Sequence, residues 1–464
     1  MKIAFVDRDL SPRTGERRFQ YNVAIQLQKL GHEVKILTGR MDRERCFPEF
    51  LRLPVEVVSR GESRIEKSLK RTILQMFHHR ERKVIGEFFE HSRPSNSHPE
   101  QKPNSNFLLE TAETFQYLMR TILAIDISKR IADSSCDVTM VQHQGEWGLL
   151  PFFYNLSGPT GAVYLNGRLR ARGAWASPAA PRFQDVTWRR RMVDSLLDIP
   201  PAGRRNKVSF NKLALFLGPS KFLLDQIKGQ LVIGQRKAEV VPMGVDHSQF
   251  FPTGEEEPYA LFVGRIHPQK SLELAVLAMK NTDPDKSLVI AGSVGSAGSG
   301  IGEEDFSWYE QRLTDLAAKI GISNRFKVIP FPSDSEMVRL MQRCSVFLYP
   351  GGDENFGVAL LEAMACGKPV VASNRCAVPE VVGDAGFLME PDPTQWQERV
   401  SRVLSNSDLR RRMGQKALER SKAFSWENTT KRLLQVFSNL KQEYGVSGSA
   451  LMSSMAPRMS PIND

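Results

Sequence analysis

The sequence predicts an α/β protein with parallel sheets that are covered by helices on both faces. The chain opens with an apolar strand at 2–7, a helical pattern at 17–30 and a second strand at 34–38. Its second half repeats short β-branched runs that alternate with helical stretches. With 464 residues and a hydrophobic content of 41%, the chain is long enough for two domains with separate cores.

The first strand–helix–strand unit is marked by spacing and by turn residues. The predicted helix carries apolar residues at helical spacing: Phe19, Val23, Ala24, Leu27 and Leu30. Pro12 to Gly15 is predicted to be the turn before it, and Gly31-His32 closes it. Further strands are predicted at 137–141 and 213–217, and Gly218 to Lys221 is predicted to open another helix.

The second half continues the alternation. Strands are predicted at 260–263, 288–291, 326–329, 346–350 and 369–373. A short helix is predicted at 358–365, and a long helix follows Phe424-Ser425-Trp426-Glu427 and extends to Tyr444.

The segment from 346 to 373 carries a carboxylate at each end of its turn-helix element. Glu354 lies in the turn and Glu362 in the helix, at most ~12 Å apart along a helix axis. A helix that starts after a glycine turn offers unpaired N–H groups, which suit a pyrophosphate. Two carboxylates can accept hydrogen bonds from hydroxyl groups on either side of that pyrophosphate. The alternative is a surface glutamate followed by a second one on an exposed helix face.

This run resembles the E-x7-E signature of retaining glycosyltransferases of the GT-B fold, family 4 or group 1. The resemblance extends to Gly31-His32-Glu33-Val34, to Gly264-Arg265 with Lys270, and to the linker-like run from Val241 to Asp246. It implies two Rossmann-like domains that face each other across a cleft, with a C-terminal helix that crosses back to the N-terminal domain.

The resemblance also implies domain boundaries. An acceptor-side domain is expected at 1–245, with a mobile insertion at about 93–106, where Pro, Ser and Asn are frequent. The nucleotide-sugar domain is expected at 246–424 and the returning helix at 425–445. Residues 446–464 are expected to be a disordered tail.

The family's site residues carry over by position. Glu354 is expected to hold hydroxyls of the donor sugar, Glu362 the ribose, and Arg265 and Lys270 the diphosphate. His143 is expected to face the donor sugar, although Gln142 competes for that position. The remaining donor-binding positions are Gly15, which matches the first glycine of the family's N-terminal pair, and Gly264, Asn355, Phe356, Gly357 and Val358.

The expected reaction is transfer of a hexose from a UDP- or GDP-linked sugar to an acceptor hydroxyl, in polysaccharide or glycolipid biosynthesis. No cofactor and no metal are expected, because the two cations and the helix start neutralise the diphosphate. An inactive GT-B-like binding or assembly protein and a nucleotide-sugar epimerase remain alternatives. No nucleic-acid motif is present.

The net charge of +11 is concentrated in two segments of the N-terminal half. Residues 59–83 hold eight Lys/Arg and three Glu, and residues 166–207 hold ten Lys/Arg and three Asp. The first segment also has an apolar stripe at helical spacing: Ile65, Leu69, Ile73, Met76 and Phe77. A basic amphipathic helix suits an anionic membrane surface and a lipid-linked or anionic acceptor. The alternative is that the stripe packs on its own domain.

The five cysteines have no metal-ligand spacing and are expected to be reduced thiols. The chain begins with a strand-like MKIAFVDRD rather than a leader, and its apolar runs are too short to cross a bilayer. A cytoplasmic protein, peripheral on the inner face of the membrane, is therefore expected.

Overall fold

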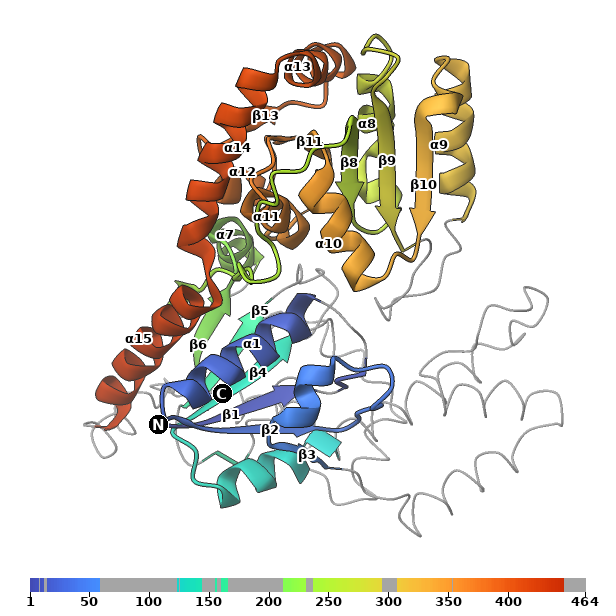
Figure 1. The fold of residues 1–464 in the computed structure, drawn as a ribbon. Coiled ribbons are helices and arrows are strands. Elements are labelled where there is room, and N and C mark those ends of the chain that lie inside the picture. Colours follow the sequence, from blue (N-terminus) through green and yellow to red (C-terminus); the bar gives the residue numbers. More distant parts are fainter. Residues whose placement is uncertain are drawn as a thin grey trace, which may run out of the picture.

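The computed structural model describes residues 1–7, 9–11, 15–58, 123–124, 126–143, 155–156, 160–165, 212–230, 237–293, 307–352 and 354–445 (Figure 1). The predictions of a mobile insertion at about 93–106 and of a disordered tail lie outside the described residues. The same holds for the basic segments 59–83 and 166–207, so the prediction of a membrane-binding helix is not addressed by the fold.

In the described residues the first sheet has seven strands, all paired in parallel, in the order β3-β2-β1-β4-β5-β6-β7. Their bounds are β1 Lys2–Asp7, β2 Glu33–Thr38, β3 Val55–Val57, β4 Val138–His143, β5 Gly161–Leu165, β6 Leu213–Gly218 and β7 Lys237–Val240.

The second sheet has six parallel strands in the order β10-β9-β8-β11-β12-β13. Their bounds are β8 Tyr259–Val263, β9 Ser287–Gly292, β10 Phe326–Pro330, β11 Val346–Tyr349, β12 Val370–Ser373 and β13 Phe387–Met389. Each sheet runs outward in both directions from its first strand. Ligands of such sheets bind beyond the carboxyl ends of the strands where the order reverses. That point lies between β1 and β4 in one sheet and between β8 and β11 in the other.

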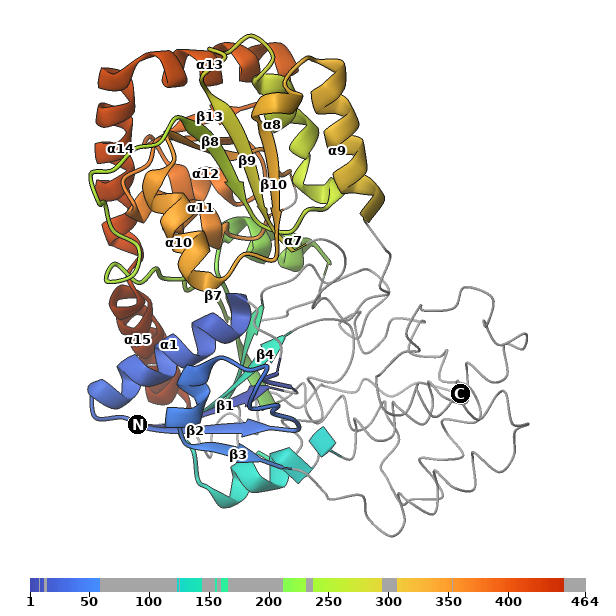
Figure 2. The ribbon, with the colours of Figure 1, turned by 45° about the vertical axis from the view of Figure 1, so that its right-hand side comes forward.

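Helices cover both sheets (Figure 2). The α-helices with bounds in the described residues are α1 Gly15–Lys29, α7 Lys221–Gln230, α8 Leu272–Ala278, α9 Ser307–Lys319, α10 Asp334–Arg343, α11 Val358–Ala365, α12 Val378–Val382, α13 Pro393–Ser405, α14 Ser407–Ser421 and α15 Trp426–Gly445. The 3-10 helices in the same residues are η1 Pro48–Arg52, η4 Pro268–Lys270, η5 Ser323–Arg325 and η6 Lys422–Phe424.

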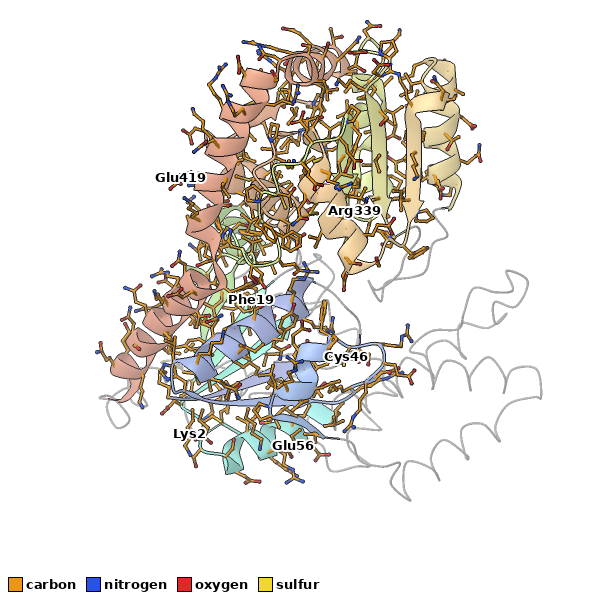
Figure 3. All side chains as sticks on the ribbon, viewed as in Figure 1. Lys2, Phe19, Cys46, Glu56, Arg339 and Glu419 are labelled. Carbon is orange, nitrogen blue, oxygen red and sulfur yellow. The ribbon has the colours of Figure 1, made fainter. Side chains whose placement is uncertain are left out.

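The last helix, α15, returns from the second sheet to the first, as predicted (Figure 1). Its start is fixed by the Val245 N–H, which donates to the Phe424 carbonyl at 2.8 Å. Phe19 of α1, labelled in Figure 3, stacks on Tyr164 with centroids 3.9 Å apart and meets Trp426 edge-on at 6.2 Å. These aromatic contacts join α1, the first sheet and α15 in one buried region.

The predicted strands and helices named above are present, with boundaries that differ by one or two residues. One prediction is wrong in detail, because Gly15 is the first residue of α1 rather than part of the preceding turn. Within the described residues, no helix combines the length and hydropathy that crossing a bilayer requires.

Candidate active site

The predicted site residues of the second half gather at its strand reversal. Gly264 and Arg265 follow β8, Lys270 ends η4, and the turn from 351 to 357 follows β11. In Figure 1 the strands β8 to β10 point toward the first sheet, so these loops lie on the side that faces the other domain. This is the expected ligand edge of a doubly wound sheet.

The turn after β11 is held by three contacts, two from the segment after β12 and one from the first domain. The Cys376 thiol donates to the Gly352 carbonyl at 2.9 Å, and the Ala377 N–H donates to the Glu354 carbonyl at 3.2 Å. From the first domain, the Ser220 hydroxyl donates to the Asn355 carbonyl at 2.7 Å. The backbone around Glu354 is therefore supported by both halves of the chain.

A second contact between the halves lies beside this turn. The carboxylate of Glu380 in α12 accepts the N–H groups of Lys221 at 2.8 Å and Phe222 at 2.7 Å. These donors are the unpaired first N–H groups of α7, which a carboxylate satisfies well. Together with Ser220, they join the start of α7 to the second domain.

The helix α11 begins after Gly357, whose φ of 98° lies in the left-handed region. No side chain caps this end of the helix. The first backbone bond of the helix runs from the Leu361 N–H to the Gly357 carbonyl at 3.1 Å. Val358, Ala359 and Leu360 thus present their N–H groups outward, an arrangement that binds phosphate. The roles of Gly357 and Val358 in donor binding stay predictions.

Lys270 and Glu354 form a largely buried ion pair, with 2.6 Å between Nζ and Oε2 and side chains 11% and 19% exposed. The same Glu354 oxygen accepts the Tyr349 hydroxyl at 2.5 Å. Burial raises the pKa of the Glu354 carboxyl, but the Lys270 charge and the two hydrogen bonds outweigh it, so the net pKa lies below the usual value. Glu354 is therefore held as a carboxylate.

Arg265 lies beside this pair but is exposed. Its charge contributes to the lowered pKa of Glu354. Its guanidinium makes no hydrogen bond or ion pair with the part of the chain that the structure describes. An exposed guanidinium next to an uncapped helix start is a suitable second cation for an anionic ligand.

Glu362 is buried, which excludes the alternative of an exposed helix face. Its carboxylate forms an ion pair with Arg18, which belongs to α1 of the first domain. Burial raises the pKa of Glu362, and the Arg18 charge only partly offsets this. The Arg18 guanidinium donates to Glu362 and so occupies the position that a hydroxyl donor, such as a ribose hydroxyl, would take.

We expect the two glutamates to affect acid stability with opposite signs. The lowered pKa of Glu354 gives a stabilisation that is complete above the unfolded-chain value of 4.5 and is lost as pH falls through the folded-state pKa. The raised pKa of Glu362 gives a contribution that decreases as pH rises above 4.5. As the pH is lowered, the difference in free energy of unfolding between wild type and Glu354→Gln should therefore become smaller. The corresponding difference between wild type and Glu362→Gln should become larger. Urea unfolding between about pH 3.5 and 7 measures both differences. The prediction is contradicted if both differences change in the same direction with pH.

Gly264 lies where β8 and β9 end side by side. Its N–H donates to the Ala291 carbonyl at 3.0 Å. A Cβ on Gly292 would lie 1.7 Å from the Gly264 carbonyl oxygen, so no side chain fits there. This close approach of two backbones brings the loop that carries Arg265 against the end of β9.

The two predicted residues of the first domain lie at the carboxyl edge of its sheet. His143 is the last residue of β4, and Gly15 begins α1. The surroundings of the His143 side chain are not described, so the choice between His143 and Gln142 stays a prediction, and so does the role of Gly15. Among the described residues, the side chain that reaches from this domain to the second carboxylate is Arg18.

Sequence reasoning missed Arg18 and Tyr349. Both touch a predicted glutamate, but neither belongs to a motif. The only sequence signal for Tyr349 is its position five residues before Glu354, at the end of an apolar strand. Within the described residues, no group of three His, Cys, Asp or Glu side chains is arranged for a metal.

Comparison with known proteins agrees with this geometry. The family model described as "Glycosyl transferases group 1" matches residues 246–420. A HepE structure from Anabaena in complex with UDP aligns with a TM-score of 0.61 and 15% identity over 95% of this chain and all of its own. WaaG, a glycosyltransferase involved in lipopolysaccharide biosynthesis, aligns with a TM-score of 0.56 and 13% identity over 94% of this chain and 99% of its own. The fold is therefore GT-B.

Curated relatives carry glycosyltransferase names. A D-inositol 3-phosphate glycosyltransferase of Salinispora arenicola is 29% identical over 242 residues, which cover 46% of this chain and 52% of the relative. A protein of the same name from Nocardioides is 26% identical over 65% of this chain and 69% of its own length. The family match thus lies in residues 246–420, the half of the chain that carries the E-x7-E run, and agrees with the resemblance read from the sequence. The chain spans about half the length of most of these relatives.

Proposed function

We propose that this chain is a retaining glycosyltransferase that moves a hexose from a nucleotide-sugar to an acceptor hydroxyl. The observation that carries the proposal is the clustering of Lys270, Glu354 and Arg265 around the uncapped start of α11. This arrangement combines an anion site with a fixed carboxylate, as a sugar diphosphate requires. The group 1 family match and the UDP complex of HepE support it.

The diphosphate lies at the α11 start in this proposal, within reach of Arg265 and Lys270. An ammonium has three donors, so Lys270 can keep its bond to Glu354 and still bind a phosphate oxygen. Both cations stabilise the charge that develops as the bond from the anomeric carbon to the phosphate oxygen breaks. Glu354 accepts hydroxyls of the sugar. The ribose hydroxyls take the place of the Arg18 guanidinium on Glu362.

Retention requires that the acceptor approach the face from which the phosphate departs. A leaving phosphate oxygen on that face can accept the proton of the acceptor hydroxyl as the new bond to the anomeric carbon forms. The protons and charges then balance without a side-chain base. The positive groups around α11 supply the electrostatic stabilisation, and we propose that turnover needs no divalent metal.

Ligand binding and product analysis test the function. Nucleotide-sugars and bare nucleotides are screened by thermal shift, because a ligand of the folded state raises the melting temperature. The best donor is then followed for release of nucleotide with and without acceptor, and the anomeric configuration of the product is read by NMR. Turnover in EDTA is expected to equal that with Mg²⁺. A sugar that changes its stereochemistry without acceptor would indicate an epimerase, and binding without turnover an inactive scaffold.

We also propose an anionic or lipid-linked acceptor at an anionic membrane surface. The support is the basic composition of residues 59–83 and 166–207 in the acceptor-side half of the chain. The name of these relatives, D-inositol 3-phosphate glycosyltransferase, contains a phosphorylated compound, and WaaG is described as involved in lipopolysaccharide biosynthesis.

Liposome co-sedimentation measures this association. Binding is expected with anionic vesicles, should weaken as salt is added, and should fall at least about fivefold when Lys67, Lys70 and Arg71 are replaced by Glu. A matched control replaces three exposed basic residues of α14 and α15 by Glu: Arg411, Arg412 and Lys431. Equal recovery with neutral and anionic vesicles would favour a soluble acceptor.

A further inference from the structure

The hydroxyl of Tyr349 is the second donor to the Glu354 carboxylate. Tyr349 is the last residue of β11 and only 4% exposed, so its hydroxyl is directed to a neighbour within the protein. The hydroxyl donates to Oε2 of Glu354 at 2.5 Å, the same oxygen that Lys270 binds at 2.6 Å. Oε1 of Glu354 receives no hydrogen bond from the described part of the chain.

The ring of Tyr349 is held in place by its neighbours. Phe262 of β8 and Phe347 of β11 each lie with a ring centroid 6.2 Å away, at interplanar angles of 25° and 20°. The Lys270 ammonium lies 5.8 Å from the centroid of the Tyr349 ring. A ring fixed by two strands holds its hydroxyl at a fixed point. The hydroxyl then determines how the Glu354 carboxylate is turned.

We propose that Tyr349 is a positioning residue that turns Oε1 of Glu354 toward the hydroxyls of the transferred sugar. This inference rests on the proposed function, because it assigns the sugar to Glu354. Two donors occupy Oε2, and Oε1 is thereby presented to the ligand. Without the Tyr349 hydroxyl, the Glu354 carboxylate is held only by its ion pair with Lys270. It can then rotate, and it orients the sugar less well.

The hydroxyl also favours the ionised form of Glu354. The charged and titratable groups that face this pair are Lys270 from η4, Arg265 after β8 and Glu362 from α11. Lys270 and Arg265 favour the Glu354 carboxylate, and so does the Tyr349 hydrogen bond. Removing the hydroxyl should therefore raise the pH at which Glu354 takes up a proton.

Tyr349→Phe tests the inference, because it removes the hydroxyl and keeps the ring. We expect kcat to fall roughly 10- to 100-fold, and the Kd of free nucleoside diphosphate to stay within about twofold of wild type. The acid limb of the kcat–pH profile should move to higher pH. The Kd of the nucleotide-sugar should rise toward that of the bare diphosphate.

The chain offers a matched control in Tyr309, a fully buried tyrosine whose hydroxyl donates to Oε2 of Glu273 at 2.5 Å. Tyr309→Phe removes the same kind of bond elsewhere in the same domain, together with the hydrogen bond that this hydroxyl accepts from the Leu272 N–H at 3.0 Å. It should lower the melting temperature by at least as much, while kcat stays within about twofold of wild type and the acid limb of the kcat–pH profile does not move. A purely structural role for Tyr349 predicts equal behaviour of the two variants.

The outcomes separate this inference from the proposed function. A wild-type protein that turns over a nucleotide-sugar, with Tyr349→Phe unchanged in kcat and pH profile, overturns the positioning role alone. If the wild type binds nucleotide-sugar without turnover, the test is the ratio of the Kd of the nucleotide-sugar to the Kd of the bare diphosphate. A ratio that is the same in Tyr349→Phe and in wild type overturns the inference. A wild type that binds no nucleotide-sugar overturns both. A Tyr349→Phe protein that fails to fold is replaced by Tyr349→Leu, for which the same Kd ratio decides.

Discussion

Alanine at position 270 is expected to lower kcat roughly 100- to 1,000-fold, with the fold preserved. Lys270 has two roles in the proposed mechanism, because its ammonium neutralises the leaving phosphate and anchors Glu354 through the 2.6 Å ion pair. Arg265→Ala removes one cation without disturbing that pair, and a smaller loss of roughly 10- to 100-fold is expected. Steady-state kinetics with the donor found by thermal shift measure both variants.

Lys368→Ala is the matched control for Lys270. Lys368 is a buried lysine at the opposite end of α11, and its ammonium donates to the Glu255 carbonyl at 3.1 Å. Its loss should lower stability but leave kcat within about threefold of wild type. If Lys270→Ala retained kcat within about fivefold while remaining folded, another group would have to neutralise the diphosphate. Activity that EDTA abolishes and Mg²⁺ restores would identify that group as a metal.

Glu354→Gln and Glu362→Gln are expected to separate turnover from nucleotide binding. A hydrogen bond to a charged group contributes ~1.5–3 kcal/mol, so the loss of the ribose contact should weaken nucleoside diphosphate by roughly 10- to 100-fold in Glu362→Gln. In the proposed function Glu354 binds the transferred sugar and not the nucleotide, so Glu354→Gln should bind the diphosphate nearly as well as wild type but lose at least about 100-fold in kcat. Calorimetric titration with free diphosphate measures the binding half of this prediction.

The reverse pattern would exchange the two roles. Arg18→Ala serves as the control for Glu362→Gln, because it breaks the same ion pair from the other side. It leaves the Glu362 carboxylate available to the ribose. Weak binding in Glu362→Gln together with near-normal binding in Arg18→Ala assigns the loss to the carboxylate itself.

The unit from β11 to β12 could be predicted closely from the sequence. Its helix begins and ends at the predicted residues, Val358 and Ala365. Gly357 and Gly367 have positive φ angles and mark both ends of this helix, so local backbone chemistry is enough to place it. The parallel pairing of the strands also follows from the alternation of strands and helices.

Contacts between distant residues could not be predicted in this way. The partners Arg18 and Glu362 are 344 positions apart, and no local pattern says which face of α1 meets α11. Glu362 looked compatible with an exposed helix face because its neighbours do not reveal that the first domain covers it. The edge strands β3 and β13 have three residues each, which is too short for a periodic signal.

The contacts of Ser220 and Glu380 affect how this protein should be studied. The second domain alone would hold Glu354, Lys270 and Arg265, and it is the obvious fragment for ligand screening. In that fragment the Asn355 carbonyl would lose its donor, and the Glu380 carboxylate would lose two backbone N–H groups. The turn that carries Glu354 would then be less firmly held, and its backbone would form hydrogen bonds with water instead. Affinities measured on the excised domain would understate those of the two-domain chain, so ligand screening needs a protein that contains both domains.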